Sequence, residues 1–356
     1  MVVAPDKFKG TLTATEAASQ IALGVRDAVP EADIELIPLA DGGEGTLSAL
    51  IDDASTVESL PTVDSWGRPL MGTVAITGNR DAIVEMSCAS GVRGGSEASG
   101  ALGASTIGSG RLIAAAVALQ VQRLLVGIGG SATTDGGTGA ATALGWRFLD
   151  RKGRELRPGG GNLHSLHAID GSNVRPLPEI VGLCDVPNAL LGARGAARTF
   201  GPQKGANSSD VDRLEEGLAR LAHVVETDLG IEIATLPMGG AGGGMGAGLV
   251  AFMGGRLTSG FEVVAEKARL AEKLATAHLV ITAEGRFDET SVAGKVTSGV
   301  ARAAAHASIP CWLVAGEISA EEGKLVAAGF SAWAACADRS AEALRTAARS
   351  LAAGLG

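Results

Sequence analysis

A glycine-rich loop with one carboxylate is the part of this chain whose residue types point most directly to chemistry. It spans residues 127–137 and follows the apolar run 124–126. Glycines let a backbone approach a ligand closely, and backbone N–H groups and hydroxyls such as those of Ser131 and Thr133 suit phosphate oxygens. Asp135 repels phosphate and points instead to a nearby cation or hydroxyl group. The loop predicts a site for a phosphorylated ligand with Mg²⁺, although a tight turn with Asp135 as a helix cap fits the same residues.

Acidic residues follow several other apolar runs that read as short strands. Asp6 comes after residues 2–4, and Asp41 and Glu44 come after residues 34–39. Ligands of open parallel sheets bind beyond the carboxyl ends of the strands, so acids in these positions are expected to converge on one edge. Each acid alone fits a helix cap or a turn, but the joint pattern favours a site. The same placement recurs at Asp135, Asp185, Glu284 and Glu317.

Common catalytic signatures are missing from the chain. It contains no HExxH motif, no Cys/His cluster and no GxSxG elbow, and Gly294–Lys295 is followed by Val296 and so does not complete a Walker A motif. The spacing Gly242-x-Gly244-x-x-Ala247 fits a loose dinucleotide fingerprint, with Glu262 further along the chain. An NAD-dependent dehydrogenase of a small hydroxy acid therefore remains an alternative, although residues 236–238 (Leu-Pro-Met) make a poor strand before these glycines.

Composition limits the classes of partner. The chain has 356 residues, which favours two domains, and 46% of them are hydrophobic. Its net charge is −9 and its pI about 5.2, with no basic stripe, so we expect no nucleic-acid partner. Charged residues from Asp6 onward argue against a signal peptide, and the apolar run 112–119 is too short to span a membrane. Four cysteines form no CxxC motif and read as reduced core thiols. We therefore expect a cytoplasmic protein with no membrane partner.

Both ends of the chain show the alternating strand and helix rhythm of a parallel sheet. At the start, strands are expected at 2–4 and 34–39, with a helix at 13–28 whose Thr13 and Glu16 fit a capping box. The rhythm returns near the end, with strands at 278–282, 311–315 and 332–336 and helices at 292–306, 320–328 and 341–352.

The middle of the chain has shorter strands joined by long glycine-rich stretches. Strands are expected there at 73–76, 82–86, 124–128 and 180–184. We therefore predict an α/β protein with a discontinuous Rossmann-like domain (1–74 plus 266–356) and a second, glycine-rich α/β domain (75–265) inserted into it.

Seven motifs in a fixed order carry a resemblance. They are 4–13 (APDKFKGTLT), 40–46 (ADGGEGT), the loop 127–137, Cys184-Asp185-Val186 with Asn188, 200–206 (FGPQKGA), 240–246 (GAGGGMG), and Glu284-Gly285-Arg286-Phe287-Asp288 with Ser291, Gly294 and Lys295. Together they resemble the bacterial glycerate kinase family, type 1, over nearly the whole chain. Ala189 and Thr297 stand where this family usually has proline.

The resemblance implies a fold and an activity. The family fold is two α/β domains with the active site in the cleft between them. The activity is transfer of the γ-phosphoryl group of ATP to D-glycerate with Mg²⁺, where the glycerate comes from glyoxylate or from sugar-acid breakdown. The product is expected to be 2-phosphoglycerate, with 3-phosphoglycerate as the other isomer, and the protein to be a monomer or homodimer.

Phosphoryl transfer mainly needs positioning and charge neutralisation, and this sets the expected roles. Lys295 and Lys204 are candidates to meet the transferring phosphate. Mg²⁺ needs only one or two carboxylates, for which Asp41 and Asp135 are the leading candidates and Asp185 is a further one. Backbone and hydroxyl groups that would hold the nucleotide are those of Gly129, Gly130, Ser131, Thr133, Gly242 and Gly243.

The acceptor hydroxyl needs a base, and glycerate needs cations and hydrogen bonds. Asp185 or Asp288 is expected to take the proton of the hydroxyl. Lys7 is expected to be exposed and without a role, and a solvated turn is an equal reading for Arg68. The substrate-binding candidates are Asp6, Lys9, Glu44, Arg68 and Arg286.

Overall fold

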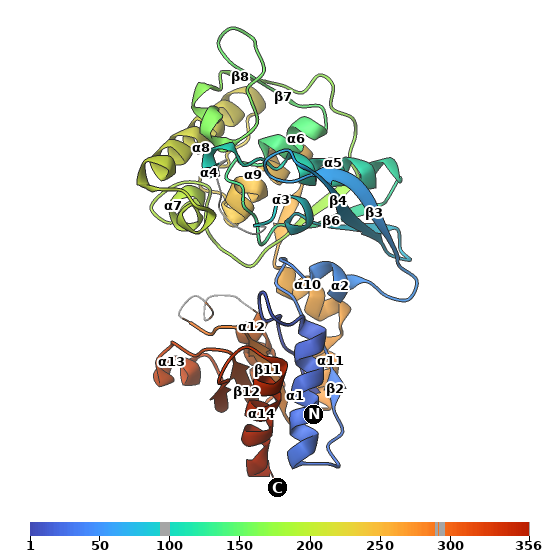
Figure 1. The fold of residues 1–356 in the computed structure, drawn as a ribbon. Coiled ribbons are helices and arrows are strands. Elements are labelled where there is room, and N and C mark those ends of the chain that lie inside the picture. Colours follow the sequence, from blue (N-terminus) through green and yellow to red (C-terminus); the bar gives the residue numbers. More distant parts are fainter. Residues whose placement is uncertain (93–99, 289–290, 292–295, 356) are drawn as a thin grey trace. The chain divides into compact units, whose positions relative to one another are not determined.

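The computed structural model describes residues 1–92, 100–288, 291 and 296–355. The chain divides into two compact units (Figure 1). Unit 1 consists of residues 1–41, 48–50 and 259–356, and unit 2 consists of residues 42–47 and 51–258. Unit 1 is thus built from both ends of the chain.

The sheet of unit 1 has five parallel strands in the order β13-β12-β11-β1-β2. Val2 of β1 pairs with Val280 of β11 on one side and with Glu35 of β2 on the other, so the N-terminal strand lies inside the sheet. Its strands are β1 (Val2–Val3), β2 (Glu35–Leu36), β11 (Val280–Glu284), β12 (Cys311–Ala315) and β13 (Ala332–Ala335).

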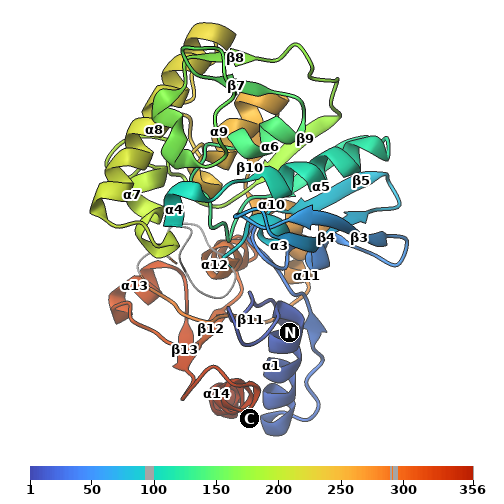
Figure 2. The ribbon, with the colours of Figure 1, turned by 45° about the horizontal axis from the view of Figure 1, so that its top comes forward.

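Helices α1 (Ala14–Ala28) and α14 (Ala341–Ala352) lie side by side in unit 1 (Figures 1 and 2). Thr13 and Glu16 form the expected capping box at the start of α1. Gly24 permits the close approach of the two helices, because a Cβ atom there would lie 2.2 Å from the Arg345 carbonyl oxygen. The remaining helices are α10 (Gly260–Lys267), α11 (Leu270–Ala275), α12 (Val296–His306) and α13 (Glu322–Ala327), with a final 3₁₀ turn (Ala353–Leu355).

Unit 2 contains a six-stranded mixed sheet in the order β10-β9-β6-β5-β4-β3. The first four strands of this order are parallel, and β4 and β3 continue the sheet as an antiparallel hairpin. The strands are β3 (Thr56–Val63), β4 (Pro69–Ile76), β5 (Asp81–Glu85), β6 (Arg123–Gly127), β9 (Glu179–Leu183) and β10 (Arg256–Thr258), and β7 (Arg147–Leu149) pairs separately with β8 (Ala168–Asp170).

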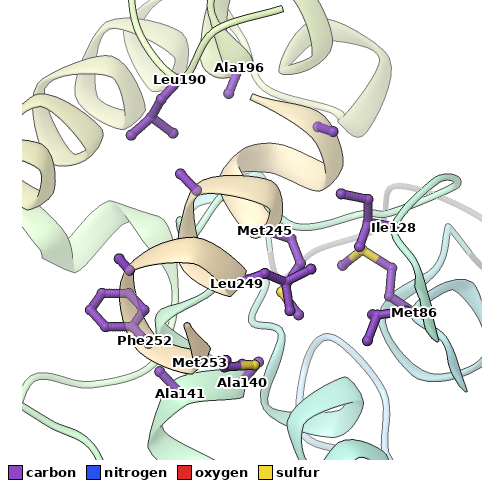
Figure 3. Packing of buried hydrophobic residues seen from close by; sticks show 14 of the residues in the cluster. Met86, Ile128, Ala140, Ala141, Leu190, Ala196, Met245, Leu249, Phe252 and Met253 are labelled. Atoms are coloured by element: carbon purple, nitrogen blue, oxygen red, sulfur yellow. The ribbon is translucent and has the colours of Figure 1, made fainter. Parts of the chain in front are cut away.

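The core of unit 2 surrounds helix α9 (Ala241–Met253), which is apolar on all sides. Its Met245, Leu249 and Phe252 are buried, and Met86 and Ile128 belong to the same cluster (Figure 3). The other helices are α2 (Thr46–Leu50), which is shared between the units, α3 (Ser87–Ser90), α4 (Gly100–Gly103), α5 (Ile107–Ala118), α6 (Thr138–Ala143), α7 (Ala196–Phe200) and α8 (Ser208–Leu229), with 3₁₀ turns at Gly160–Ser165 and Pro202–Lys204.

One helical stretch among the described residues, Gly100–Ala118, is long and apolar enough to cross a membrane. In this structure 56% of it is buried, and Leu112 and Ile113 are fully buried in the core of unit 2. The stretch therefore has the features of a core helix.

The boundaries between the units differ from the expected ones. The first lies near residue 50 instead of 74, because β3 and β4 pair with β5 and complete the sheet of unit 2. The second lies at 258/259 instead of 265/266. Of the helix expected at 292–306, residues 292–295 lie outside the described part of the chain, and α12 begins at Val296.

Candidate active site

The loop after β6 holds the main polar cluster of unit 2. The Lys204 Nζ atom donates to Ser131 Oγ at 2.9 Å and to the Thr133 carbonyl oxygen at 2.6 Å. Lys204 is only 8% exposed. Burial lowers the pKa of Lys204 to about 7, and the charge of Asp135 opposes this shift. Three residues expected to bind the nucleotide are thus in direct contact, although Lys204 is far from the other two in sequence.

Asp135 lies fully buried in the same loop. Its carboxylate accepts hydrogen bonds from the Thr106 N–H and hydroxyl, at 2.8 and 2.9 Å, and from the N–H groups of Gly137 and Gly139, both at 3.2 Å. Burial raises the pKa of the Asp135 carboxyl, and these hydrogen bonds oppose the rise. Oδ2 joins the start of α5 to the start of α6, and Oδ1 accepts from Gly137 at the start of α6. These hydrogen bonds give Asp135 a structural role, and its role as a metal ligand stays a prediction.

Gly242, Gly243 and Gly244 all have positive φ angles at the start of α9. The Gly243 carbonyl oxygen accepts from the Gly136 N–H at 3.1 Å, and a Cβ atom on Gly243 would lie 1.9 Å from the Thr133 carbonyl oxygen. These glycines therefore bring α9 against the β6 loop. Residues 231–240 form no strand before them, so the strand-to-helix context of a dinucleotide fingerprint is missing.

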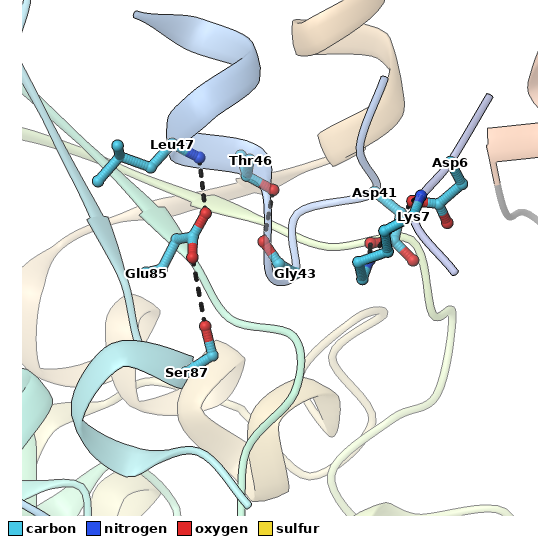
Figure 4. Close-up of polar contacts among 8 residues, drawn as sticks. All are labelled: Asp6, Lys7, Asp41, Gly43, Thr46, Leu47, Glu85 and Ser87. Carbon is cyan, nitrogen blue, oxygen red and sulfur yellow. Dashed lines mark hydrogen bonds and ion pairs between the residues drawn. The ribbon is translucent and has the colours of Figure 1, made fainter. Parts of the chain in front are cut away.

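The glycine-rich motif at 40–46 also contacts the loop 127–137 that follows β6. The Gly129 N–H donates to the Gly42 carbonyl oxygen at 3.1 Å. Glu85, at the end of β5, accepts from the Leu47 N–H at 2.7 Å and from the Ser87 hydroxyl at 3.4 Å (Figure 4). Glu85 is a buried acid at the end of an apolar strand and was not among the expected site residues.

In unit 1, Lys7 joins two strand-end acids. Its ammonium lies 3.4 Å from Asp6 Oδ1, after β1, and 3.4 Å from Asp41 Oδ1, after β2 (Figure 4). Burial lowers the pKa of Lys7, but Asp41 and Asp6 outweigh burial and the pKa is raised overall. The expectation that Lys7 is exposed is therefore wrong, since its side chain is only 18% exposed and is paired with two acids.

Asp6 has a pKa well above that of an ordinary aspartate. Burial is the main reason that its pKa is raised, to about 7. Asp41 and Glu284 add to the rise, and Lys7 opposes it. At neutral pH, Asp6 therefore lies near the midpoint of its titration.

Glu284 ends β11 and is buried. It accepts hydrogen bonds from the Thr297 hydroxyl at 2.6 Å and from the Ser291 hydroxyl at 3.1 Å. The Ser291 N–H in turn donates to Asp288 Oδ1 at 3.3 Å. Thr297, which replaces the proline usual in the resembled family, thus supplies a hydrogen bond that proline cannot make.

The remaining candidates are Arg286, Arg68, Lys9, Glu44, Asp185 and Lys295. Arg286 Nε lies 3.7 Å from Asp288 and 3.5 Å from Glu317, on the surface of unit 1. Arg68 is exposed and pairs with Asp64 in the turn between β3 and β4, which agrees with the solvated-turn reading. Lys9 and Glu44 are exposed, Asp185 is half-buried after β9, and Lys295 lies outside the described residues.

No group of three or more His, Cys, Asp or Glu residues that could hold a metal ion occurs among the described residues. Mg²⁺ nevertheless needs no such cage, because it is commonly bound through one or two carboxylates and the phosphates of the substrate. The Asp41 carboxylate, whose side chain is 27% exposed, fits this single-ligand chemistry.

Comparison with known proteins shows the family of the chain. The sequence model of the Glycerate kinase family matches residues 1–355 of the chain. The chain belongs to the glycerate kinase family. Membership makes it an ATP-dependent kinase.

Individual glycerate kinases match at similar levels. The glycerate kinase of Halalkalibacterium halodurans is 42% identical over 89% of this chain and 85% of its own length. The glycerate 2-kinase of Escherichia coli K12 is 39% identical over 93% of this chain and 89% of its own length. A crystal structure described as a glycerate kinase 2 from Salmonella typhimurium LT2 superposes with a TM-score of 0.81 at 37% identity, covering 99% of this chain and 97% of that one.

The clusters of this glycerate kinase family member coincide with the resembled motifs. In unit 2, the loop 127–137 and the motifs at 200–206 and 240–246 meet around Lys204 and Gly243. In unit 1, Asp6 and Asp41 come from the first two motifs, and Lys7 connects them. The family residues thus take part in polar clusters in both units.

Proposed function

We propose that this protein is a glycerate kinase that transfers the γ-phosphoryl group of ATP to a hydroxyl of D-glycerate with the help of Mg²⁺. The observation that carries the proposal is the match to the glycerate kinase family over residues 1–355, together with relatives of that name at about 40% identity. The four free cysteines fit the reducing cytoplasm as the place of the reaction.

In this proposal, the β6 loop of unit 2 holds the nucleotide phosphates. The Gly130 N–H makes no hydrogen bond within the described part of the chain, and Ser131, Thr133 and Lys204 lie beside it in the loop cluster. Gly129, Gly242 and Gly243 keep the backbone of this region close-packed. Backbone N–H groups and a buried ammonium are suited to phosphate oxygens.

Asp41 is the proposed Mg²⁺ ligand, and the metal would neutralise charge on the phosphates when bound. Asp6 and Arg286 are the proposed contacts to glycerate in unit 1, through a hydrogen bond and a cation, and Lys9 is a further cation. Asp185 and Asp288 remain the two candidates for the base that takes the proton of the attacking hydroxyl. Lys295 is a second candidate for the transferring phosphate.

We favour 2-phosphoglycerate as the product. The support is the relative from Escherichia coli, 39% identical over 93% of the chain, which is a glycerate 2-kinase. Enolase uses 2-phosphoglycerate directly, whereas 3-phosphoglycerate must first pass through a mutase. Product that is converted by enolase alone would support the 2-position, and a requirement for mutase would support the 3-position.

The activity itself is tested by ADP release with purified protein, ATP and D-glycerate. We expect ADP release that depends on D-glycerate and stops when EDTA removes divalent metal. L-Glycerate and the protein without acceptor serve as controls. ADP release that is equally fast without glycerate, or reduction of NAD with glycerate in place of ADP release, would contradict the proposal.

A further inference from the structure

Lys204 is a buried lysine for which the described residues supply no acidic partner. Its Nζ atom has two hydrogen-bond acceptors, Ser131 Oγ and the Thr133 carbonyl oxygen, and both are neutral. Among the described residues, no carboxylate lies within ion-pair distance of this nitrogen. A buried ammonium that lacks a counter-ion is costly, and a lysine in such a place favours the neutral amine.

The number of acceptors matches the neutral form. A neutral amine has two N–H groups and one lone pair, whereas an ammonium has three N–H groups. Ser131 and Thr133 use two N–H groups and leave the third position of the nitrogen without a partner in the described part of the chain. That position holds a lone pair in the neutral amine and would hold an N–H after protonation.

Other polar groups of the same loop also lack partners. The hydroxyls of Thr133 and Thr134 are buried and make no hydrogen bond in the described structure. Buried polar groups are normally paired, so two neighbouring exceptions next to a buried lysine call for an explanation. An oxyanion accepts hydrogen bonds from hydroxyls and from an ammonium alike, and it also supplies the missing negative charge.

We propose that the Lys204 amine takes up one proton from solvent when a phosphate oxygen of the nucleotide binds beside it, so that nucleotide binding is linked to proton uptake. The inference rests on the proposed function, because it assumes that the β6 loop holds the phosphates. The proton adds to the nitrogen lone pair, and the new N–H donates to the phosphate oxygen. Ser131 and Thr133 keep their two hydrogen bonds throughout.

The charges around Lys204 agree with this coupling. Among the described residues, the charge of Asp135 raises the pKa of Lys204, and the Asp135 carboxylate already accepts four hydrogen bonds. Without ligand, burial holds the pKa of Lys204 at about 7. A bound phosphate raises it, so uptake approaches one proton above pH 7 and falls towards zero below pH 6.

The test is calorimetric titration of the full-length protein with MgATP at pH 8 and at pH 6. Buffers with different ionisation enthalpies, but without phosphate or sulfate, give the number of protons exchanged. We expect close to one proton taken up at pH 8 and little at pH 6. Absence of uptake at pH 8, or equal uptake at both values, would overturn the inference without needing any variant.

Variants assign the proton to Lys204. Lys204→Met removes the amine and should abolish uptake and weaken MgATP binding roughly 10- to 100-fold. Lys204→Arg stays charged and should bind MgATP without uptake. Lys152→Met, an exposed lysine of the same unit, is the matched control and should behave as wild type. Wild-type uptake in a folded Lys204→Met protein would refute the assignment.

The same preparations separate this inference from the proposed function. Wild-type protein that releases ADP with D-glycerate but takes up no proton overturns only the role of Lys204. Protein that binds MgATP with uptake but does not phosphorylate glycerate overturns the substrate assignment alone. Protein that binds no MgATP contradicts both.

Discussion

The charge state of Asp6, which follows β1, is set mainly by its burial. Its pKa is about 7 in the folded protein, against 3.8 for an ordinary aspartate, mainly because the side chain is buried. Folding therefore favours the protonated form. The stabilisation from this preference is fully present below about pH 4 and is lost as the pH rises through 7.

The substitution Asp6→Asn tests this linkage, because Asn is neutral at every pH and similar in shape. We expect the Tm of the variant, relative to wild type, to rise between pH 4 and pH 8. Thermal melts followed by circular dichroism at several pH values measure the difference. Asp53→Asn changes an exposed aspartate and should give a flat difference. Parallel curves for Asp6→Asn and wild type would show that Asp6 titrates normally.

At the scale of elements, α9 and the β6 loop fit together only because Gly243 lacks a side chain. A Cβ atom there would lie 1.9 Å from the Thr133 carbonyl oxygen, which is also an acceptor of Lys204. The φ angle of Gly243, +71°, adds strain for any other residue. The position of α9 and the hydrogen bonding of Lys204 are therefore coupled.

Gly243→Ala should therefore destabilise the protein by more than the strain of its positive φ angle alone. Gly254→Ala is the matched control, because Gly254 has φ +61° at the other end of α9 and nothing within 4 Å of its Cβ position. We expect about 1 kcal/mol of lost stability for Gly254→Ala and at least twice that for Gly243→Ala, with lower kcat/KM only for the latter. Urea unfolding and the ADP-release assay measure both. Equal losses would show that the loop adjusts to the methyl group.

Elements with strong local signals were predictable from the sequence. The strand at 311–315 and the helix at 341–352 have the expected bounds, because one is a continuous apolar run and the other has a clear helical period. Strand β3 (Thr56–Val63) gave no such signal, because most of its residues before the last two are exposed and because it contains Pro61. This missing strand is why the boundary was expected too late.

The candidate site was predictable only where its partners are near in sequence or belong to a known motif. The β6 loop was recognisable from its own residues, and Lys204 came from the family motif. Lys7 was misjudged because Asp41, one of its two partners, lies 34 residues away. Asp135 was ambiguous because the decisive donor, Thr106, lies 29 residues upstream. Local sequence does not show such pairings.

At the scale of the whole molecule, the two units differ in how they depend on the ends of the chain. Strand β1 pairs with both β11 and β2, so the sheet of unit 1 needs residues from both termini. A fragment 259–356 would leave β11 as an open edge. Unit 2 has its own six-stranded sheet and core within residues 51–258, but residues 42–47 also pack on it.

Fragments test whether unit 2 is an independent folding unit and whether the segment 42–47 is part of it. We expect fragment 42–258 to unfold cooperatively in urea. Fragment 51–258 should be less stable by roughly 1–3 kcal/mol, because Glu85 loses the Leu47 N–H and Gly129 loses the Gly42 carbonyl oxygen. A fragment 42–258 that carries Gly42→Ala is a further check, because the added Cβ would lie 2.4 Å from the Leu183 carbonyl oxygen. This substitution should remove much of the stability that fragment 42–258 has over fragment 51–258. Equal stability of fragments 42–258 and 51–258 would mean that the segment packs on unit 2 without stabilising it.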